Sequence, residues 1–362
     1  HWLEGKGLGF GPKVRVIVGG LYPRGHGAEG GGYGYIRVLE KFIKAYPDKV
    51  KVFTDTQAVK LIKDEAGKVI GVVGKHDGKE VNFMASKGVI IATGGFGSNV
   101  EMRQAKNTGV WKEVTLDKNI PCTNNFKASQ GDGLKLAEQV GANVINLDDI
   151  QLHPGGTPKT GIMSSWPSGR NRIFLTPQGD RFVNEDAARD TLCKAIFKEG
   201  GKYWIVSNHV KYPTLDYQSK NLTIGEMIKL GQAFSGNTIE ELAQKTGMDP
   251  KKLKASIETY NDVVTGKIKE DNLGFKKFTQ DDKPMTEGPF YATPMVPAVH
   301  HTMGGIQINS AAQVLDKAGH VIPGLFAAGE VTGGVHGSNR VGGNGVADAM
   351  VFGRVSGQSA LK

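Results

Sequence analysis

The sequence is poor in cysteine, lacks any long apolar run, and shows no basic stretch interleaved with aromatic residues. Its two cysteines, Cys122 and Cys193, form no CxxC pair, which argues against the common zinc, dithiol and haem-attachment motifs. We expect free thiols, with a disulfide between them as the alternative. No apolar run reaches the roughly 18 residues of a membrane-spanning helix. Without a basic–aromatic run we expect no nucleic-acid partner, and no ligand spacing predicts a metal site.

The sequence also begins without Met. Residues 1–10, HWLEGKGLGF, show no signal peptide and do not read as the start of a domain. We therefore expect the natural N-terminus to lie upstream of His1. The compartment, cytoplasmic or extracytoplasmic in a bacterium, stays open.

Positive charge and glycine are both in excess. The formal net charge is +9, which favours an anionic substrate, an anionic cofactor or an acidic partner. A basic surface without functional meaning is the alternative. The 51 glycines have no collagen-like period and are about twice as frequent as the usual share of roughly 7%. We therefore place them in loops and turns.

Periodicity predicts strands and helices in two domains. Residues 50–95 alternate apolar and polar positions around turns at EAGK and HDGK, which predicts a β-meander whose last strand is apolar throughout. Helical spacing marks four segments, residues 35–46, 131–142, 238–245 and 250–264. The texture of the sequence changes near Asn143 and returns near His300. We therefore divide the chain into residues 1–142 and 302–362, a dinucleotide-binding domain, and an inserted domain of residues 143–301.

Some local features are sharper. Residues 25–34 read as a glycine loop, and the following helix places Ile36, Leu39, Phe42 and Ile43 on one face. Thr238 followed by Glu241 predicts a capping box.

A glycine stretch lies near the C-terminus. Residues 331–345, VTGGVHGSNRVGGNG, contain six glycines, one His and one Arg. They follow residues 323–330, PGLFAAGE, which read as a short buried strand ending in an acid. Glycine is costly in regular elements, so this cluster indicates close approach of backbone to a ligand, or positive φ.

Five motifs follow one another in the chain: ATGGFG at 92–97, GDG at 131–133, RFVNEDAARD at 181–190, HHTMGG at 300–305, and PGLFAAGEVTGGVHGSNRVGGNG at 323–345. Their order resembles the soluble fumarate reductase flavoproteins of the succinate dehydrogenase and fumarate reductase flavoprotein family, over nearly the whole chain. Urocanate and acrylate reductases, and more distantly ketosteroid dehydrogenases, are relatives. The resemblance implies an α/β fold, with an FAD-binding Rossmann-like domain and an inserted α+β capping domain.

The resemblance implies FAD as cofactor. Glu330 matches the acid that binds the FAD ribose, and His301 lies by the flavin. The other implied cofactor-binding residues are Thr93, Gly94, Gly95, Asp132, Gly329, Asn344, Gly345 and Val346. For His336 a structural or flavin-contacting role and a substrate contact stay open. The family's GxGxxG segment, which holds the FAD pyrophosphate at a helix N-terminus, has no counterpart here. Either the chain is a fragment or another polypeptide supplies it, so we expect the chain alone to bind FAD poorly.

The resemblance also implies a site for a carboxylic acid. Arg340 matches the carboxylate clamp, a task that suits the rigid fork of Arg, with a surface arginine as the alternative. His300 contacts the same carboxylate, His153 holds a second carboxylate, and Met163 packs on the substrate.

One part of the implied pocket departs from the family. Fumarate reductases place Thr-Glu shortly after the methionine, where this sequence has Ser165 and Trp166. Ser165 could keep the hydroxyl contact, but Trp166 cannot replace a carboxylate.

Arg189 matches the family's general acid, with a salt-bridged helix arginine as the alternative. The implied reaction moves a hydride from flavin N5 to the β-carbon of the alkene and a proton from Arg189 to the α-carbon. The family returns that proton through a Glu and a second Arg. Because Trp166 stands at the Glu position, the relay is altered or another acid serves. The candidates are Glu185, Asp186 or Asp190 for the acid and Arg170 or Arg172 for the arginine.

The sequence thus predicts an FAD-dependent reductase of an activated C=C bond in a small unsaturated acid of the fumarate type. The alternatives are a reductase of urocanate or another acrylate-type acid, and a dehydrogenase working in reverse on succinate or a ketosteroid. No nicotinamide site is evident, so we expect an electron-donor domain or protein that carries FMN or haem. A non-catalytic binding or scaffold chain is the alternative of another class.

Overall fold

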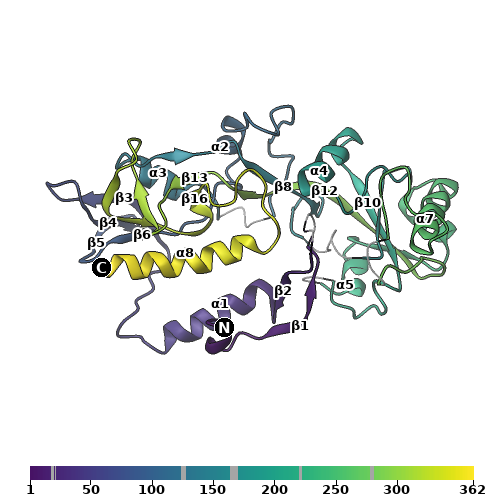
Figure 1. The fold of residues 1–362 in the computed structure, drawn as a ribbon, viewed down its shortest axis with the longest axis horizontal. Coiled ribbons are helices and arrows are strands. Elements are labelled where there is room, and N and C mark those ends of the chain that lie inside the picture. Colours follow the sequence, from purple (N-terminus) through teal and green to yellow (C-terminus); the bar gives the residue numbers. More distant parts are fainter. Residues whose placement is uncertain (18–19, 21, 124–127, 164–169, 220–221, 278–280) are drawn as a thin grey trace.

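The computed structural model describes residues 1–17, 20, 22–123, 128–163, 170–219, 222–277 and 281–362. Two lobes lie side by side along the long axis (Figure 1). Strands β8 (Ile150–Gly156) and β12 (Phe290–Thr302) lie between them. Among the described residues, no helix is long and apolar enough to cross a membrane.

The first lobe contains three small sheets. An antiparallel meander consists of β3 (Thr56–Lys63), β4 (Val69–His76) and β5 (Lys79–Met84). The second sheet has the order β14 (Gln313–Leu315), β15 (Val321–Ala327), β6 (Val89–Ile91), and the third has the order β16 (Thr332–Gly333), β13 (Gly305–Gln307), β7 (Val144–Ile145). The predicted meander is confirmed for β3 to β5. Its expected last strand, β6, instead pairs in parallel with β15, consistent with an apolar run that lacks the alternation of a half-exposed strand.

Helices cover these sheets. They are α2 (Val100–Ala105), α3 (Asp132–Glu138) and α8 (Asn344–Ala360), and the short 3-10 helix η2 (Gly329–Val331) follows β15. Ile91 in β6, Leu134 in α3 and Val331 in η2 belong to one buried cluster. This core therefore fixes the start of the glycine stretch beside the ends of β6 and α3.

The second lobe is a mixed α and β unit. Its sheet joins β9 (Ile173–Leu175), β10 (Tyr203–Asn208), β11 (Phe234–Gly236) and the first half of β12 through antiparallel pairs. The helices of this lobe are α4 (Arg189–Lys198), α5 (Ile224–Lys229), α6 (Ile239–Thr246) and α7 (Pro250–Val264). Leu253 and Ile257 of α7 pack against Val206 of β10 in a separate core, so this lobe has its own hydrophobic centre.

Strand β12 connects the two lobes. Its 13 residues begin in the second lobe's sheet and end beside β8, where Ala298 pairs with His153 and His301 with Gln151. The register shifts on both sides of Ala298 and Val299. These irregular pairs bring three histidines of the two strands, His153, His300 and His301, to the junction of the lobes.

The N-terminal segment lies below α8 in Figure 1. It consists of a 3-10 helix, η1 (Glu4–Lys6), a hairpin of β1 (Phe10–Arg15) and β2 (Gly25–Ala28), and helix α1 (Gly31–Lys44). The glycine loop expected at residues 25–34 is therefore a strand followed by the first turn of a helix. The helix itself is confirmed, but Ile36 and Phe42 are 59% and 41% exposed while Val38 is buried. The spacing of apolar residues thus predicted the helix but not which of its faces packs against the rest of the protein.

Two further expectations can be compared with the structure. The thiols of Cys122 and Cys193 are free, as predicted. At the start of α6, Thr238 Oγ1 accepts a hydrogen bond from the Glu241 amide at 3.1 Å, but the Glu241 carboxylate accepts from the Asn237 amide at 2.8 Å. Only half of the predicted capping box is thus present, because the carboxylate reaches one residue further back.

Candidate active site

Three histidines lie where β8 and β12 pair. The rings of His153 and His300 are 4.9 Å apart between centroids, and His300 Nδ1 lies 2.7 Å from Thr123 Oγ1. His301 faces a different group, the carboxylate of Glu330, as expected for neighbours in a strand. His153 Nδ1 accepts a hydrogen bond from the Gly155 amide at 3.0 Å, so the proton of the neutral ring sits on Nε2.

His301 and Glu330 form a buried pair. His301 Nδ1 lies 3.3 Å from Glu330 Oε2, and Glu330 Oε1 accepts from the Thr302 amide at 3.1 Å. Burial lowers the pKa of His301, although Glu330 opposes this shift. Burial would raise the pKa of Glu330, but the hydrogen bond from His301 and the Thr302 amide lower it below its usual value. Both directions describe a neutral imidazole beside an ionised carboxylate.

Arg340 completes this side of the junction. Its side chain is buried and donates from Nη1 to the Val341 carbonyl at 3.3 Å. Burial lowers its pKa, while Glu330 and Asp348 oppose the change. A Cβ on Gly345, in the first turn of α8, would lie 3.4 Å from both Arg340 Nη1 and His301 Cε1. Glycine at this position therefore keeps the backbone of α8 close to both side chains.

Arg189 is the first residue of α4 and is also buried. Its Nη1 donates to Gln151 Oε1 at 3.0 Å. Burial and the nearby positive charge of Arg340 lower the pKa of Arg189 to about 10. Two buried guanidinium groups, one from each lobe, therefore lie near one another.

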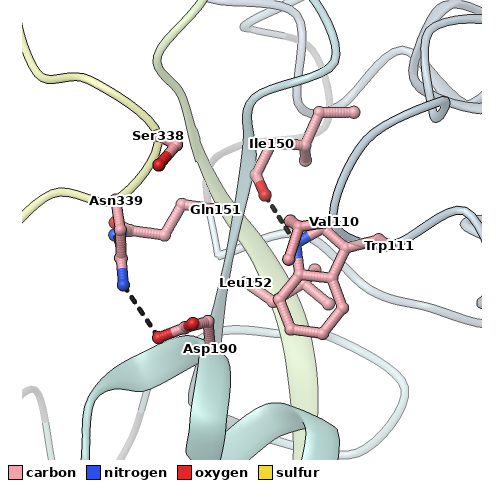
Figure 2. Close-up of a pocket in the computed structure, with 8 residues that line it drawn as sticks. All are labelled: Val110, Trp111, Ile150, Gln151, Leu152, Asp190, Ser338 and Asn339. Carbon is pink, nitrogen blue, oxygen red and sulfur yellow. Dashed lines mark hydrogen bonds between the residues drawn. The ribbon is translucent and has the colours of Figure 1, made fainter.

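Gln151 connects these two arginines. Its Nε2 donates to Asn339 Oδ1 at 2.8 Å and to the Arg340 carbonyl at 2.7 Å. Asn339 Nδ2 in turn donates to Asp190 Oδ1 at 2.8 Å, the bond drawn in Figure 2. The adjoining cavity, lined in part by Ser338 and Trp111, has a volume of only about 60 Å³. It is too small for a substrate, and the hydrogen bonds beside it link β8 and α4 to the glycine stretch.

The residues present fit the flavin cofactor that the sequence implies. His301 Nε2 and Arg340 Nε are buried and have no hydrogen-bond partner among the described residues. A Cβ on Gly95 would meet Thr302 Oγ1 at 2.1 Å and Glu330 Oε1 at 2.6 Å. Buried polar groups are rarely left unpaired. The Arg340 Nε donor and His301 Nε2, which is an acceptor when Nδ1 donates to Glu330, therefore indicate missing partners, as a flavin would supply.

The other expected cofactor residues surround the same place. Thr93, Gly94 and Gly95 follow β6, Asp132 begins α3, Gly329 and Glu330 lie in η2, and Asn344, Gly345 and Val346 form the first turn of α8. A Cβ on Gly133 would lie 2.1 Å from Thr93 Oγ1, which shows how closely α3 approaches the end of β6. Two helix N-termini, which favour negative charge, thus open near the buried pair of His301 and Glu330.

The remaining expected residues are placed less centrally. Met163 is buried after β8, whereas Ser165 and Trp166 lie outside the described residues. Within the second lobe, Arg170 binds Asp282 and Asp186, Arg172 binds Asp186, and Arg181 binds Glu185 and Asp271. His336 Nε2 lies 3.3 Å from Asp348 Oδ2, and its ring meets that of His301 edge-on at 5.5 Å. No group of three or more possible metal ligands occurs in the described part of the chain.

Gln151, Asn339 and Thr123 were not predicted from the sequence. Gln151 precedes His153 by two residues on β8, so strand periodicity could have placed both on one face. Asn339 directly precedes Arg340 within the glycine stretch. Neutral amides and hydroxyls carry no signal of their own in a single sequence, and only the structure shows what they bind.

Comparison with known proteins identifies the family. Residues 14–346 match the family model described as FAD binding domain. The chain is 38% identical to the NADH:acrylate oxidoreductase of Vibrio harveyi over 99% of its own length and 35% of that protein. It is 35% identical to a protein of Shewanella frigidimarina named probable fumarate reductase, over 100% of the chain and 59% of that protein.

A solved structure agrees. The open conformation of a flavocytochrome c3 fumarate reductase superposes with a TM-score of 0.74 at 33% identity, over 99% of this chain and 61% of that one. The chain thus spans between about a third and three fifths of the length of these relatives. The site agrees with this match, because a glycine-rich helix N-terminus lies beside a buried Glu–His pair. The match over residues 14–346 shows that the chain belongs to the FAD-binding flavoprotein family that includes the soluble fumarate reductases, with FAD as its cofactor.

Proposed function

We propose that this chain carries the catalytic site of an FAD-dependent reductase that saturates an activated C=C bond in a small unsaturated carboxylic acid. The observation that carries this proposal is the pair Arg189 and Arg340. Both are buried, Arg340 lowers the pKa of Arg189, and neither forms an ion pair with a carboxylate among the described residues. Glu330 and Asp348 offset the charge of Arg340 only in part, and the side chain beside Arg189 is the neutral amide of Gln151. An anionic substrate between the two arginines would therefore stabilise both.

The surrounding side chains suit a carboxylate. Arg340 offers a planar fork that binds carboxylate in two-point fashion. His300, held by Thr123 at 2.7 Å, and His153, with its proton on Nε2, offer further donors. We propose that Arg340 and His300 hold the carboxylate that activates the alkene, and that His153 and Met163 contact the far end of the substrate.

The proposed chemistry adds one hydride and one proton across the double bond. Bound FAD supplies the hydride. Arg189 supplies the proton: its pKa of about 10 lies well below the ordinary value for an arginine, which makes it a better acid. Arg189 and Arg340, the two cations beside the carboxylate, stabilise the negative charge that develops there as hydride arrives. Arg189 is left neutral and must regain its proton, for which Asp190 and the other acids named above remain predictions.

The substrate itself is proposed by class. Fumarate is the first candidate, because His153 and Arg340 provide for two carboxylates. An acrylate-type acid is the second candidate, favoured by the identity to the acrylate oxidoreductase and by Trp166 at the expected Glu position. A ketosteroid has no carboxylate to occupy the space between the arginines.

The lobes and partners have proposed roles as well. We propose that residues 143–301 cap the flavin site. Arg189 comes from this part of the chain, whereas His301 lies at its border and Arg340 belongs to the other lobe. Electrons reach the flavin from a domain or protein that carries FMN or haem.

The test is oxidation of reduced viologen by the FAD-loaded protein. Fumarate, urocanate and an aryl acrylate are compared at matched concentrations, and oxidation of a 3-ketosteroid is measured beside them. The proposal predicts turnover with at least one of the three acids and none with the steroid. Faster steroid oxidation than acid reduction would refute it, and preference for the aryl acrylate would select the second candidate.

A further inference from the structure

The partner of Arg189 differs from those of other arginines in the same lobe. Arg170, Arg172 and Arg181 each bind at least one carboxylate. Arg189 binds the neutral amide of Gln151 instead, and its Nε has no hydrogen-bond partner among the described residues. Ion pairs hold the pKa of Arg170 and Arg181 above the ordinary value, whereas the pKa of Arg189 is lowered.

The orientation of the Gln151 amide is fixed from its other end. Its Nε2 donates to two oxygens, Asn339 Oδ1 and the Arg340 carbonyl. A flipped amide would set its own oxygen against both acceptors and its NH2 group against the guanidinium of Arg189. Oε1 must therefore face Arg189, because an amide nitrogen only donates and its oxygen only accepts.

The orientation of Asn339 is fixed in the same way. Its Nδ2 donates to the carboxylate of Asp190, an acceptor only, so Oδ1 is left for Gln151. Asp190 follows Arg189 in α4, and Figure 2 shows its bond to Asn339 beside Gln151. The four side chains form a closed ring that begins and ends at the first turn of α4 and passes through β8 and the glycine stretch.

We propose that Gln151 is a positioning residue that fixes the guanidinium of Arg189 through a neutral acceptor, so that Arg189 is oriented without being neutralised by an ion pair. The inference rests on the proposed function, in which Arg189 donates a proton. It also explains why a buried arginine at the junction of the lobes has no carboxylate next to its Nη1: an acid at position 151 would hold the proton on Arg189. Gln151 also donates to the carbonyl of Arg340, which couples the acid to the carboxylate clamp.

The test compares Gln151→Glu and Gln151→Leu with wild type in the FAD-loaded protein. A carboxylate beside an arginine stabilises its charged form, so Gln151→Glu should lower kcat about tenfold to hundredfold and move the alkaline limb of the pH profile to higher pH. Gln151→Leu removes the acceptor without adding charge, so kcat should fall while KM for the acid changes less than about threefold. Gln139→Glu makes the same charge change on an exposed residue of the first lobe and should match wild type.

Further variants separate the possible failures. Asn339→Leu keeps Gln151 but removes one of the two acceptors that orient its amide, and should lower kcat less than Gln151→Leu does. This variant provides the test if a variant at position 151 loses its flavin absorbance. Wild-type kcat and an unshifted pH profile in Gln151→Glu, with Arg189→Ala inactive, would overturn this inference alone. Turnover that survives in Arg189→Ala would overturn the proposed function and the inference together.

Discussion

Gly95 offers the sharpest structural prediction, because a single added methyl group would strike the buried pair that faces the flavin site. In Gly95→Ala the new Cβ would lie 2.1 Å from Thr302 Oγ1 and 2.6 Å from Glu330 Oε1. Neither oxygen can yield easily: Thr302 is fully buried, and Glu330 is held by His301 and by the Thr302 amide. The Glu330 carboxylate must therefore move away from one of its donors.

The size of this effect follows from the cost of overpacking, which is about 1–3 kcal/mol for one added group in a packed core. For a chain of this size that corresponds to a fall in Tm of roughly 2–4 °C for each kcal/mol. Displacement of Glu330 should also reduce the FAD retained after purification. Differential scanning fluorimetry and the ratio of flavin to protein absorbance measure the two effects.

The matched control is Gly357→Ala. Gly357 lies within α8, and a Cβ there would meet nothing within 4 Å. Alanine favours a helix interior over glycine by about 0.5–1 kcal/mol, so this variant should be as stable as wild type or slightly more so. If Gly95→Ala matched wild type in both Tm and FAD content, the account of the Gly95, Thr302 and Glu330 contact would be wrong.

Four other outcomes are expected. Arg189→Ala should abolish turnover but leave the flavin bound, because Arg189 comes from the second lobe; loss of flavin absorbance would count against its role as acid. Glu330→Ala should weaken FAD retention, and an unchanged affinity in equilibrium dialysis would exclude its cofactor role. With the unsaturated acid as substrate, kcat should decline as pH rises through about 10, the pKa of Arg189, since Arg189 must be protonated to donate. A flat profile to pH 11 would contradict this. Stability should fall as pH drops below about 6.5 and again below about 4.5, the ordinary values for His and Glu: both folded pKa values are lowered, so the unfolded chain takes up protons first. His301→Gln should remove the decrease in Tm below about pH 6.5. If that decrease persisted in the variant, another group would be responsible for it.

Much of the site was predictable because its residues carry charge and follow glycine-rich motifs. His300 and His301 are adjacent in a strand, so their opposite orientations follow from strand geometry alone. The close approach of backbone at Gly95 and Gly345 was predictable in kind, since glycine permits contacts that a Cβ would block. The atoms that lie there, Thr302 and Glu330 in one case and Arg340 and His301 in the other, come from distant segments and required the fold.

Other features were beyond the sequence for physical reasons. Strand β6 reads as part of the meander, but its partner is β15. The two strands begin at Val89 and Val321, more than two hundred residues apart, and long-range parallel pairing leaves no local pattern. The helix at Gly31–Lys44 was predicted, yet its packed side is set by neighbours rather than by spacing. Gln151 was missed because its importance lies in what it lacks, a charge, and only its position between Arg189, Asn339 and Arg340 shows this.

The central claim is that a buried pair of arginines recognises the carboxylate of an unsaturated acid. The most direct test compares an acid with its methyl ester, for example the better of fumarate and an aryl acrylate, in the reduced-viologen assay with the FAD-loaded protein. The account predicts that the free acid is reduced with a kcat/KM at least about a hundredfold higher than the ester. The ester lacks the anionic partner that the buried arginines would bind, and loss of the partner of a buried charge costs about 3–5 kcal/mol. Equal rates for acid and ester would contradict it, because the carboxylate would then play no part in binding or activation.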